Sequence, residues 1–453
     1  MLLSRDREFY GRAFRLTGWI ASQNAVVYLV GLAGNVMVGA YSQDALAGIA
    51  LAGQFQYLLH LLVTGIGDGM AVLTSQYWGG KKPESIRSLL SIGLKVALTL
   101  GMSFLITAQF FASDILGLLT RDGKAVAEGA AYLRVLSIGF PFFCISIALM
   151  SAQRSVENVA PGMVASGLAL ICNVTLSWLL IFGNLGFPEL GIRGAAVAVL
   201  AGRMVECAAM VVYTYGIDKK LALGWKQLIS VNRRLFRDFC KVVLPVALAG
   251  GSWGAAMIVQ TGILGHLSSP VVAADSIANA LFQVVSVVVY GIASASAVLI
   301  GKAVGAGERN RLKEYVDTLQ VLYLVLGMVS GLILFLLKDW LLMLYAITPE
   351  AKSYAGSFIT ILSFTIIGTS YQCGCLTGIV RGGGNTKFVL YNDLIFMWCI
   401  VIPLSFLTAF VLRWNPVWVY VCLKSDQITK CAVALWQVNT YHWVRKVTRE
   451  DGA

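Results

Sequence analysis

The sequence has 453 residues, of which 58% are hydrophobic and only 13% are charged. Soluble globular proteins carry about 25% charged residues, so this composition excludes that class and indicates a membrane protein. The net charge of +12 does not indicate nucleic acid, because the basic residues fall between apolar stretches and form no single patch. We therefore expect a lipid bilayer around the chain and no nucleic-acid partner.

Twelve apolar stretches along the chain are each long enough to cross a bilayer as a helix. We place them at 16–40, 45–67, 88–111, 131–153, 161–183, 193–216, 241–265, 272–300, 316–337, 355–380, 387–411 and 416–440. With the N-terminus in the cytoplasm, most of the 35 lysines and arginines fall on the cytoplasmic side, as the positive-inside rule requires. The sequence thus predicts an all-α, multi-pass protein of the cell (inner) membrane with both termini cytoplasmic.

The second half of the chain partly repeats the first. The stretch GIGDGMAVLTSQYWGG from Gly65 parallels GIASASAVLIGKAVGA from Gly291, and the same spacing separates Gly39 from Gly265. With six spans in each half, both halves enter the membrane from the same side, which makes the repeat a parallel one. The repeat therefore predicts two related six-helix lobes.

A polar, basic segment separates the two halves. We predict an N-terminal lobe at 1–216, a cytoplasmic basic linker at 217–240 and a C-terminal lobe at 241–453. Trp225, Leu228 and Ile229 lie among the basic residues of the linker, which suits a helix on the anionic inner leaflet. A solvated connector is the alternative.

Motifs along almost the whole chain carry a family resemblance. They include VMVGAYSQDALAGIA from Val36, CNVTLSWLLIFG from Cys172, AVLIGKAVGAGE from Ala297 and GIVRGGGNTK from Gly378. In this order they resemble the MATE (multidrug and toxic compound extrusion) family of transporters. The resemblance implies that the two six-helix lobes surround a central cleft. It also implies a secondary transporter that exports small organic compounds by alternating access, coupled to H⁺ or Na⁺ influx and without another cofactor. We expect it to be a monomer.

The acidic residues that couple ions in this family are missing from the matching positions. The aspartate of helix 1 in the family corresponds to Gly34 here, and the acidic positions of helices 7 and 10 correspond to Trp253 and Thr369. Other ionisable residues at membrane depth therefore become the candidates, because such residues usually face a cavity or the interior of the bundle.

The sharpest candidates are Lys424, Asp426 and Lys430 in the last span. Helical spacing puts Asp426 and Lys430 on one face, whereas Lys424 points away from Asp426, so one of them should meet another helix. We interpret the three residues as a substrate- or ion-binding site. Their surplus positive charge would suit an anionic or zwitterionic substrate.

Arg203 and Glu206 form a similar acid–base pair in the sixth span, the repeat counterpart of the last. The alternative for this pair is a permanent ion pair that fixes helix packing. Further substrate- or ion-binding candidates are polar residues within the spans: Asn35, His60, Asn173, Gln283 and Asp393. For each of them, a hydrogen bond between neighbouring helices is the structural alternative.

The sequence contains no enzyme motif that we could identify. Gly79-Gly80-Lys81-Lys82 lacks the frame of a nucleotide-binding loop, and no metal or hydrolytic cluster is found. We expect no enzymatic activity and no metal. Two alternatives to the exporter stay open: a lipid-linked precursor flippase of the same superfamily, and a channel or a sensor that does not transport.

Overall fold

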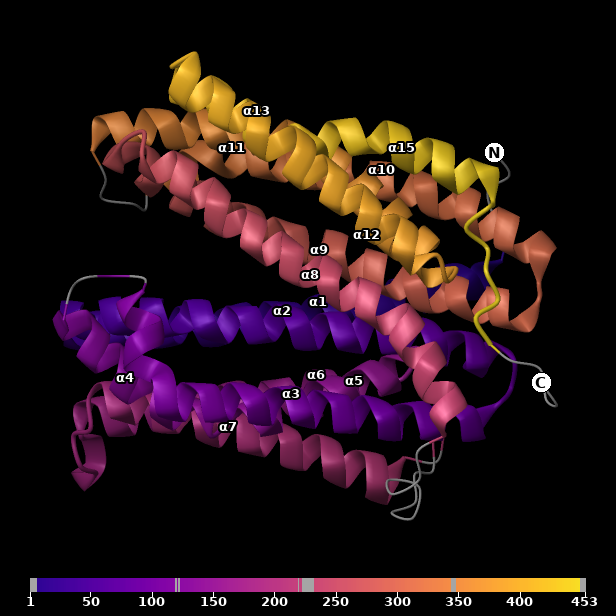
Figure 1. Cartoon of the computed structure of the whole chain (residues 1–453), viewed down its shortest axis with the longest axis horizontal. Helices are drawn as coiled ribbons and strands as arrows, with labels where there is room; N and C mark the ends of the chain where they lie inside the picture. The colour runs from indigo at the N-terminus through magenta and orange to yellow at the C-terminus, as the bar shows by residue number, and fades with distance from the viewer. Residues whose placement is uncertain are drawn as a thin grey trace. The chain divides into compact units, whose positions relative to one another are not determined.

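The computed structural model describes residues 6–118, 120, 123–218, 220–221, 232–343 and 348–448, without the side chains of residues 32, 35, 36, 40 and 43–47. Within these ranges all regular secondary structure is helical (Figure 1). The first half contains α1 Arg7–Tyr41, α2 Gln43–Gly79, α3 Pro83–Gly117, α4 Gly123–Ser137, α5 Phe140–Ser155, α6 Ala160–Phe182, the 3₁₀ turn η1 Asn184–Gly186, α7 Ile192–Val212 and the π-helical η2 Tyr213–Ile217.

The second half begins with four long helices, which are α8 Arg233–Gly265, α9 Ser269–Ala306, α10 Arg309–Met343 and α11 Pro349–Cys373. It continues with the π-helical η4 Gly374–Val380, α12 Thr386–Leu394, the π-helical η5 Ile395–Val401, α13 Ile402–Phe406, the π-helical η6 Leu407–Val411, α14 Pro416–Leu423 and α15 Asp426–Thr440.

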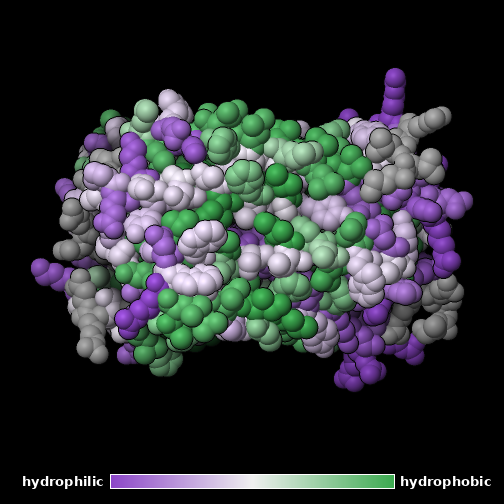
Figure 2. All heavy atoms as spheres, turned by 90° about the horizontal axis from the view of Figure 1, so that it is seen from above, coloured by the Kyte–Doolittle hydropathy of each residue, from purple (hydrophilic) through white to green (hydrophobic). Residues whose placement is uncertain are grey.

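Each predicted span coincides with helical structure. Among the described residues, nine helices are long and apolar enough to cross a membrane, and the bent pair of α4 and α5 makes a tenth if it forms one span. Apolar side chains are exposed over much of the face drawn in Figure 2, whereas hydrophilic residues gather toward the ends of the helices. The chain is therefore an all-α, multi-pass membrane protein.

Two predicted spans are not single straight helices. The span at 131–153 bends by 52° between α4 and α5, where Pro141 has no N–H to continue the hydrogen-bond ladder. The span at 416–440 breaks at Lys424, whose φ of −104° and ψ of 7° leave the helical region. The Ser425 hydroxyl donates to the Cys422 carbonyl over 2.7 Å, a local bond that competes with the helix. The prediction of one continuous helix at 416–440 is therefore wrong at this point.

The described chain divides into two compact units. Unit 1 comprises Met1–Ala21, Ser75–Lys81 and Leu248–Ala453, and unit 2 comprises Ser22–Thr74 and Lys82–Ala247. Three helices, α1, α2 and α8, contribute residues to both units. The lobe boundaries at residues 216 and 241 stay a prediction. The linker residues 219 and 222–231, including the proposed interfacial helix around Trp225, lie outside the described residues.

In unit 2, α7 packs against α4, α5 and α6, and α3 packs against α4 and α5. The contact between α6 and α7 is close because Gly194 faces the backbone of Leu180. A Cβ at Gly194 would lie 2.5 Å from the Leu180 carbonyl oxygen, so this approach requires glycine. Small residues allow membrane helices to approach in this way.

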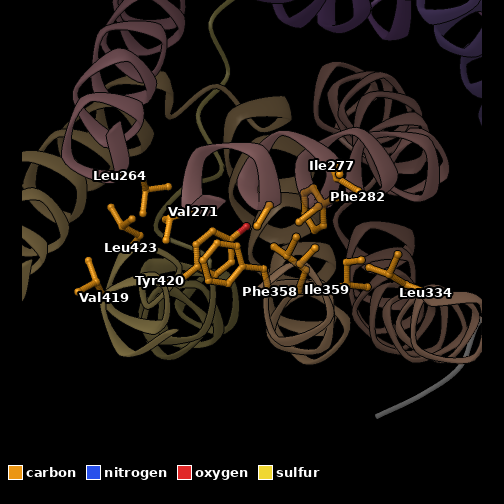
Figure 3. Close-up of a cluster of buried hydrophobic side chains, with 14 of the residues drawn as sticks. Leu264, Val271, Ile277, Phe282, Leu334, Phe358, Ile359, Val419, Tyr420 and Leu423 are labelled. Atoms are coloured by element: carbon orange, nitrogen blue, oxygen red, sulfur yellow. The ribbon is translucent and has the colours of Figure 1, made fainter. Parts of the chain in front are cut away.

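In unit 1, α9, α10 and α11 pack against one another, and α15 packs against α11. Figure 3 shows a buried apolar cluster that joins α14 to α9 and α11. At its centre the rings of Phe358 and Tyr420 stack face to face, with centroids 3.9 Å apart and planes 6° apart. This packing holds α14 in place and thereby positions Lys424, the first residue after α14.

Candidate functional site

Lys430 of α15 binds two carboxylates from different helices. Its ammonium lies 3.0 Å from Asp393 Oδ1 in α12 and 3.3 Å from Asp426 Oδ2, one turn earlier in α15. The side chains of Lys430, Asp426 and Asp393 are 5%, 11% and 31% exposed, respectively. Helical spacing predicted the contact with Asp426, whereas the contact with Asp393 depends on how the two helices pack.

Lys424 lies at the break between α14 and α15 and is buried. It interacts electrostatically with Asp275 of α9 and with Asp426, and its ammonium is 5.3 Å from the centre of the Tyr420 ring. Asp275 is buried as well and accepts a 2.6 Å hydrogen bond from the amide of Asn279. The expected partner of Lys424 on another helix is therefore Asp275.

We call Asp275, Asp393, Lys424, Asp426 and Lys430 the C-half cluster. It contains three carboxylates and two ammonium groups, so one carboxylate has no matching lysine within the cluster. The expected surplus of positive charge is therefore wrong for this group. That expectation counted only the residues of the last span and left out the carboxylates that α9 and α12 bring to it.

The sequence analysis did not single out Asp275. A signal was present, because Asp275 and Asn279 are four residues apart in the apolar stretch VVAADSIAN and so share a helix face. An ionisable residue with a polar neighbour at this spacing inside a span is a pattern that indicates a buried site.

In unit 2, Arg203 and Glu206 of α7 form a second charged group. The Arg203 guanidinium donates to Glu206 Oε2 over 3.1 Å, and the Ser166 hydroxyl of α6 donates to Glu206 Oε1 over 2.8 Å. The guanidinium also lies over the ring of Phe143, 4.3 Å from its centre. Both oxygens of the Glu206 carboxylate are thus hydrogen-bonded by side chains of unit 2.

A small pocket opens beside this pair, and we call it the N-half pocket. It is lined by α1, α6 and α7 through Val26, Val27, Val30, Ser166, Ala169, Asn173, Val199, Gly202, Arg203 and Glu206. Asn173 is 2% exposed, and its amide nitrogen has no hydrogen-bond partner among the described residues. The pocket therefore combines an apolar wall with an ion pair and an amide donor that is available to a ligand.

The predicted candidate His60 lies close to the same group. Its ring stacks on Phe143 with centroids 5.8 Å apart, and it interacts electrostatically with Arg203. Phe143 therefore contacts both His60 and Arg203. The structure brings His60, Arg203, Glu206 and Asn173 into one neighbourhood, which the sequence alone did not predict.

Of the two remaining candidates, Gln283 joins neither group. Gln283 is exposed on α9, and the side chain of Asn35 lies outside the described residues. Two positions correspond to acidic residues by the family resemblance. One is Trp253, whose side chain is 40% exposed, and the other is Thr369, whose hydroxyl donates to the Thr365 carbonyl over 3.1 Å. No group of three or more His, Cys, Asp or Glu residues suited to a metal ion is found in the described ranges.

The sequence matches the family model MatE over residues 20–179 and 252–407. Two bacterial relatives show the extent of the similarity. The probable multidrug resistance protein NorM of Thermotoga maritima is 23% identical over 94% of this chain and 92% of its own length. The probable multidrug resistance protein YoeA of Bacillus subtilis is 22% identical over 83% of this chain and 82% of its own length.

Solved structures share the fold at low sequence identity. The eukaryotic MATE transporter AtDTX14 superposes with a TM-score of 0.84 at 19% identity, covering 97% of both chains. A MOP superfamily transporter from Pyrococcus furiosus, whose binding pocket is described as having reverse polarity, superposes with a TM-score of 0.86 at 18% identity over 95% of both chains. The fold described above therefore extends over nearly the whole length of these proteins.

Proposed function

This chain belongs to the MatE family, and from this membership we propose that it is a secondary active transporter that exports small organic compounds by alternating access. Influx of H⁺ or Na⁺ drives the export. The alternative of a lipid-linked precursor flippase is not favoured, because the matched model is MatE and relatives such as NorM of Thermotoga maritima are named for multidrug resistance.

One observation carries the proposal for the coupling site, namely the charge balance of the C-half cluster. Counted within the cluster alone, its three carboxylates and two lysines leave one negative charge when all are ionised. An uncompensated charge within a membrane span is costly. Binding of one H⁺, one Na⁺ or one cationic substrate makes the C-half cluster neutral. Once one of them is bound, the cluster no longer attracts a second cation. Such competition between driving ion and substrate is what antiport requires.

Within the cluster, Asp393 is the member that exchanges with solvent. Its side chain is 31% exposed, against 11% for Asp426 and 5% for Lys430. Protonation of Asp393 releases Lys430, which then neutralises Asp426 alone. Asp393 also lies two residues before the π-helical η5, and π-helical turns are common at functional sites.

The N-half pocket is a separate proposed site within unit 2, where a polar group of a substrate binds. Its valines offer an apolar surface, and the free amide of Asn173 can donate to a carbonyl or carboxylate oxygen. Because Glu206 is already paired with Arg203 and Ser166, we assign the pair the role of a fixed dipole beside the pocket, not that of a proton carrier.

The membrane arrangement is part of the same proposal. Both termini and the basic linker at 217–240 lie in the cytoplasm, the lobes comprise 1–216 and 241–453, and the protein works as a monomer. The distribution of lysine and arginine along the sequence supports the orientation.

The function can be tested with the purified full-length chain in liposomes loaded with ethidium, a fluorescent lipophilic cation. A proton gradient and a sodium gradient are imposed separately on matched vesicles. We expect efflux that one of the two gradients accelerates about tenfold over vesicles without protein. Ohmic conductance without a gradient requirement would instead indicate a channel, and movement of a labelled lipid between leaflets would indicate a flippase.

A further inference from the structure

The chain after α15 is held against the helices of unit 1 by one buried side chain and by backbone hydrogen bonds. We call Tyr441–Thr448 the tail. Trp443 is 0% exposed, and its indole nitrogen donates to the Val438 carbonyl over 2.9 Å. The Arg445 amide donates to the Gly383 carbonyl over 2.9 Å. A Cβ at Gly383 would overlap the Trp443 ring, so the tail and the turn before α12 fit closely. Terminal segments are usually poorly ordered unless they are held in place in this way.

The tail also binds the end of a helix from the first half of the sequence. The Gln76 amide nitrogen donates to the Arg445 carbonyl over 3.2 Å, and its amide oxygen accepts from the Val447 N–H over 2.9 Å. Gln76 is fully buried. A side-chain amide is a donor and an acceptor at once, so this one residue satisfies two backbone groups of the tail.

Gln76 lies where α2 and α9 come into backbone contact. A Cβ at Gly305 of α9 would overlap the Gln76 backbone, and a Cβ at Gly79 of α2 would overlap the Lys302 carbonyl. These glycines belong to the repeated motif of the two halves, and Ser75–Lys81 lies in the same unit as α9 and the tail. The tail thus covers the point where the ends of α2 and α9 meet.

The first half docks the chain that follows its last span in a related way. There, the chain after η2 also returns to the turn between its fourth and fifth spans: Gln153 donates to Asp218 over 2.9 Å, and Lys220 donates to the Val156 carbonyl over 3.2 Å. Docking on this turn is therefore common to both halves. The two hydrogen bonds to Gln76 are a feature of the tail.

We propose that the tail is a latch that holds the ends of α2 and α9 together at the cytoplasmic side. The inference rests on the alternating access proposed above, in which these ends must separate to open the inward-facing state. Each tail hydrogen bond to Gln76 stabilises the closed arrangement, and opening requires release of Arg445 and Val447 from Gln76. The tail therefore sets the fraction of molecules that open inward.

The latch can be tested by measuring one distance by double electron–electron resonance. Spin labels are attached at the exposed positions Lys81 and Arg309, both in unit 1, in a chain whose nine native cysteines are replaced. We expect one narrow distance distribution in the full chain. Gln76→Ala and truncation after Thr440 should each add a longer distance and raise its population about tenfold, which corresponds to about 1.4 kcal/mol.

Two controls keep the result specific. Truncation after Thr448 retains Val447 and should leave the distance distribution unchanged. Trp436→Ala, at an exposed tryptophan of α15, should also leave it unchanged, whereas Trp443→Ala, at the buried tryptophan of the tail, should add the longer distance. An unchanged distribution in Gln76→Ala and in the folded truncated chain would overturn the latch. Because the distance is measured without transport, a failure of the proposed export would appear separately in the liposome assay.

Discussion

Lys430 and Asp393 form an ion pair of 3.0 Å between α15 and α12, although 37 positions separate them in the sequence. The same ammonium holds Asp426, so one buried lysine is shared by two carboxylates. Breaking a buried pair by removing one partner costs much more than the pair contributes, because a buried charge is left without a partner. The consequences of this arrangement can be measured.

Lys430→Met should destabilise the protein strongly. The substitution keeps the volume but leaves Asp393 and Asp426 without their shared ammonium, and breaking a buried pair costs about 3–5 kcal/mol. Because Asp393 is 31% exposed, we expect the lower end of that range. Denaturation in detergent micelles measures the free energy of unfolding.

The matched control for Lys430 is Lys338→Met in α10. Lys338 is only partly buried and donates to the Thr360 hydroxyl over 3.3 Å, so its loss should cost about 1 kcal/mol or less. The double variant Lys430→Met with Asp426→Asn should recover part of the stability. Equal losses at Lys430 and Lys338 would show that the shared ion pair is not stabilising.

Ser166→Ala should weaken the Glu206 site in unit 2. The serine hydroxyl donates to Glu206 over 2.8 Å, and hydrogen bonds to charged groups contribute about 1.5–3 kcal/mol. Thermal unfolding in detergent reports the loss, with Ser177→Ala, at another buried serine of α6, as the control. If the two variants unfold at the same temperature, the hydrogen bond contributes nothing measurable.

Gly331→Ala should disrupt the contact between α10 and α11. A Cβ at this position would overlap the Ser363 carbonyl, a backbone atom that cannot move without shifting α11. Overpacking of this kind costs about 1–3 kcal/mol. Gly356→Ala in α11 is the control, because its Cβ would meet only Leu342 at an ordinary 3.7 Å. A stability of Gly331→Ala equal to that of the control would mean that the helices readjust.

The positions of the helices could be predicted from sequence because twenty apolar residues in a row have few other structures available in a bilayer. The break at Lys424 could not, because the sequence around it has no proline or glycine that signals an interrupted helix. The prediction that Lys424 points away from Asp426 assumed a continuous helix, whereas the structure interrupts the helix between these two residues.

The sequence showed most of the charged residues of the site, but it predicted only those partners that lie on the same helix. Spacing within one helix predicted Asp426 with Lys430 and Arg203 with Glu206. The ion pair of Lys430 with Asp393 and the electrostatic interaction of Lys424 with Asp275 join different helices, and only the tertiary packing brings these residues near one another. The expected sign of the charge failed for this reason.

The most direct test of the coupling site is Asp393→Asn in the liposome assay. With this carboxylate neutralised, the C-half cluster has equal numbers of carboxylates and lysines and no longer needs a cation. The variant should still move ethidium down its own gradient, while accumulation driven by H⁺ or Na⁺ falls about tenfold or more. Asp339→Asn, at an exposed position of α10, should behave as the unmodified chain. Undiminished gradient-driven accumulation in Asp393→Asn would contradict the proposed coupling site.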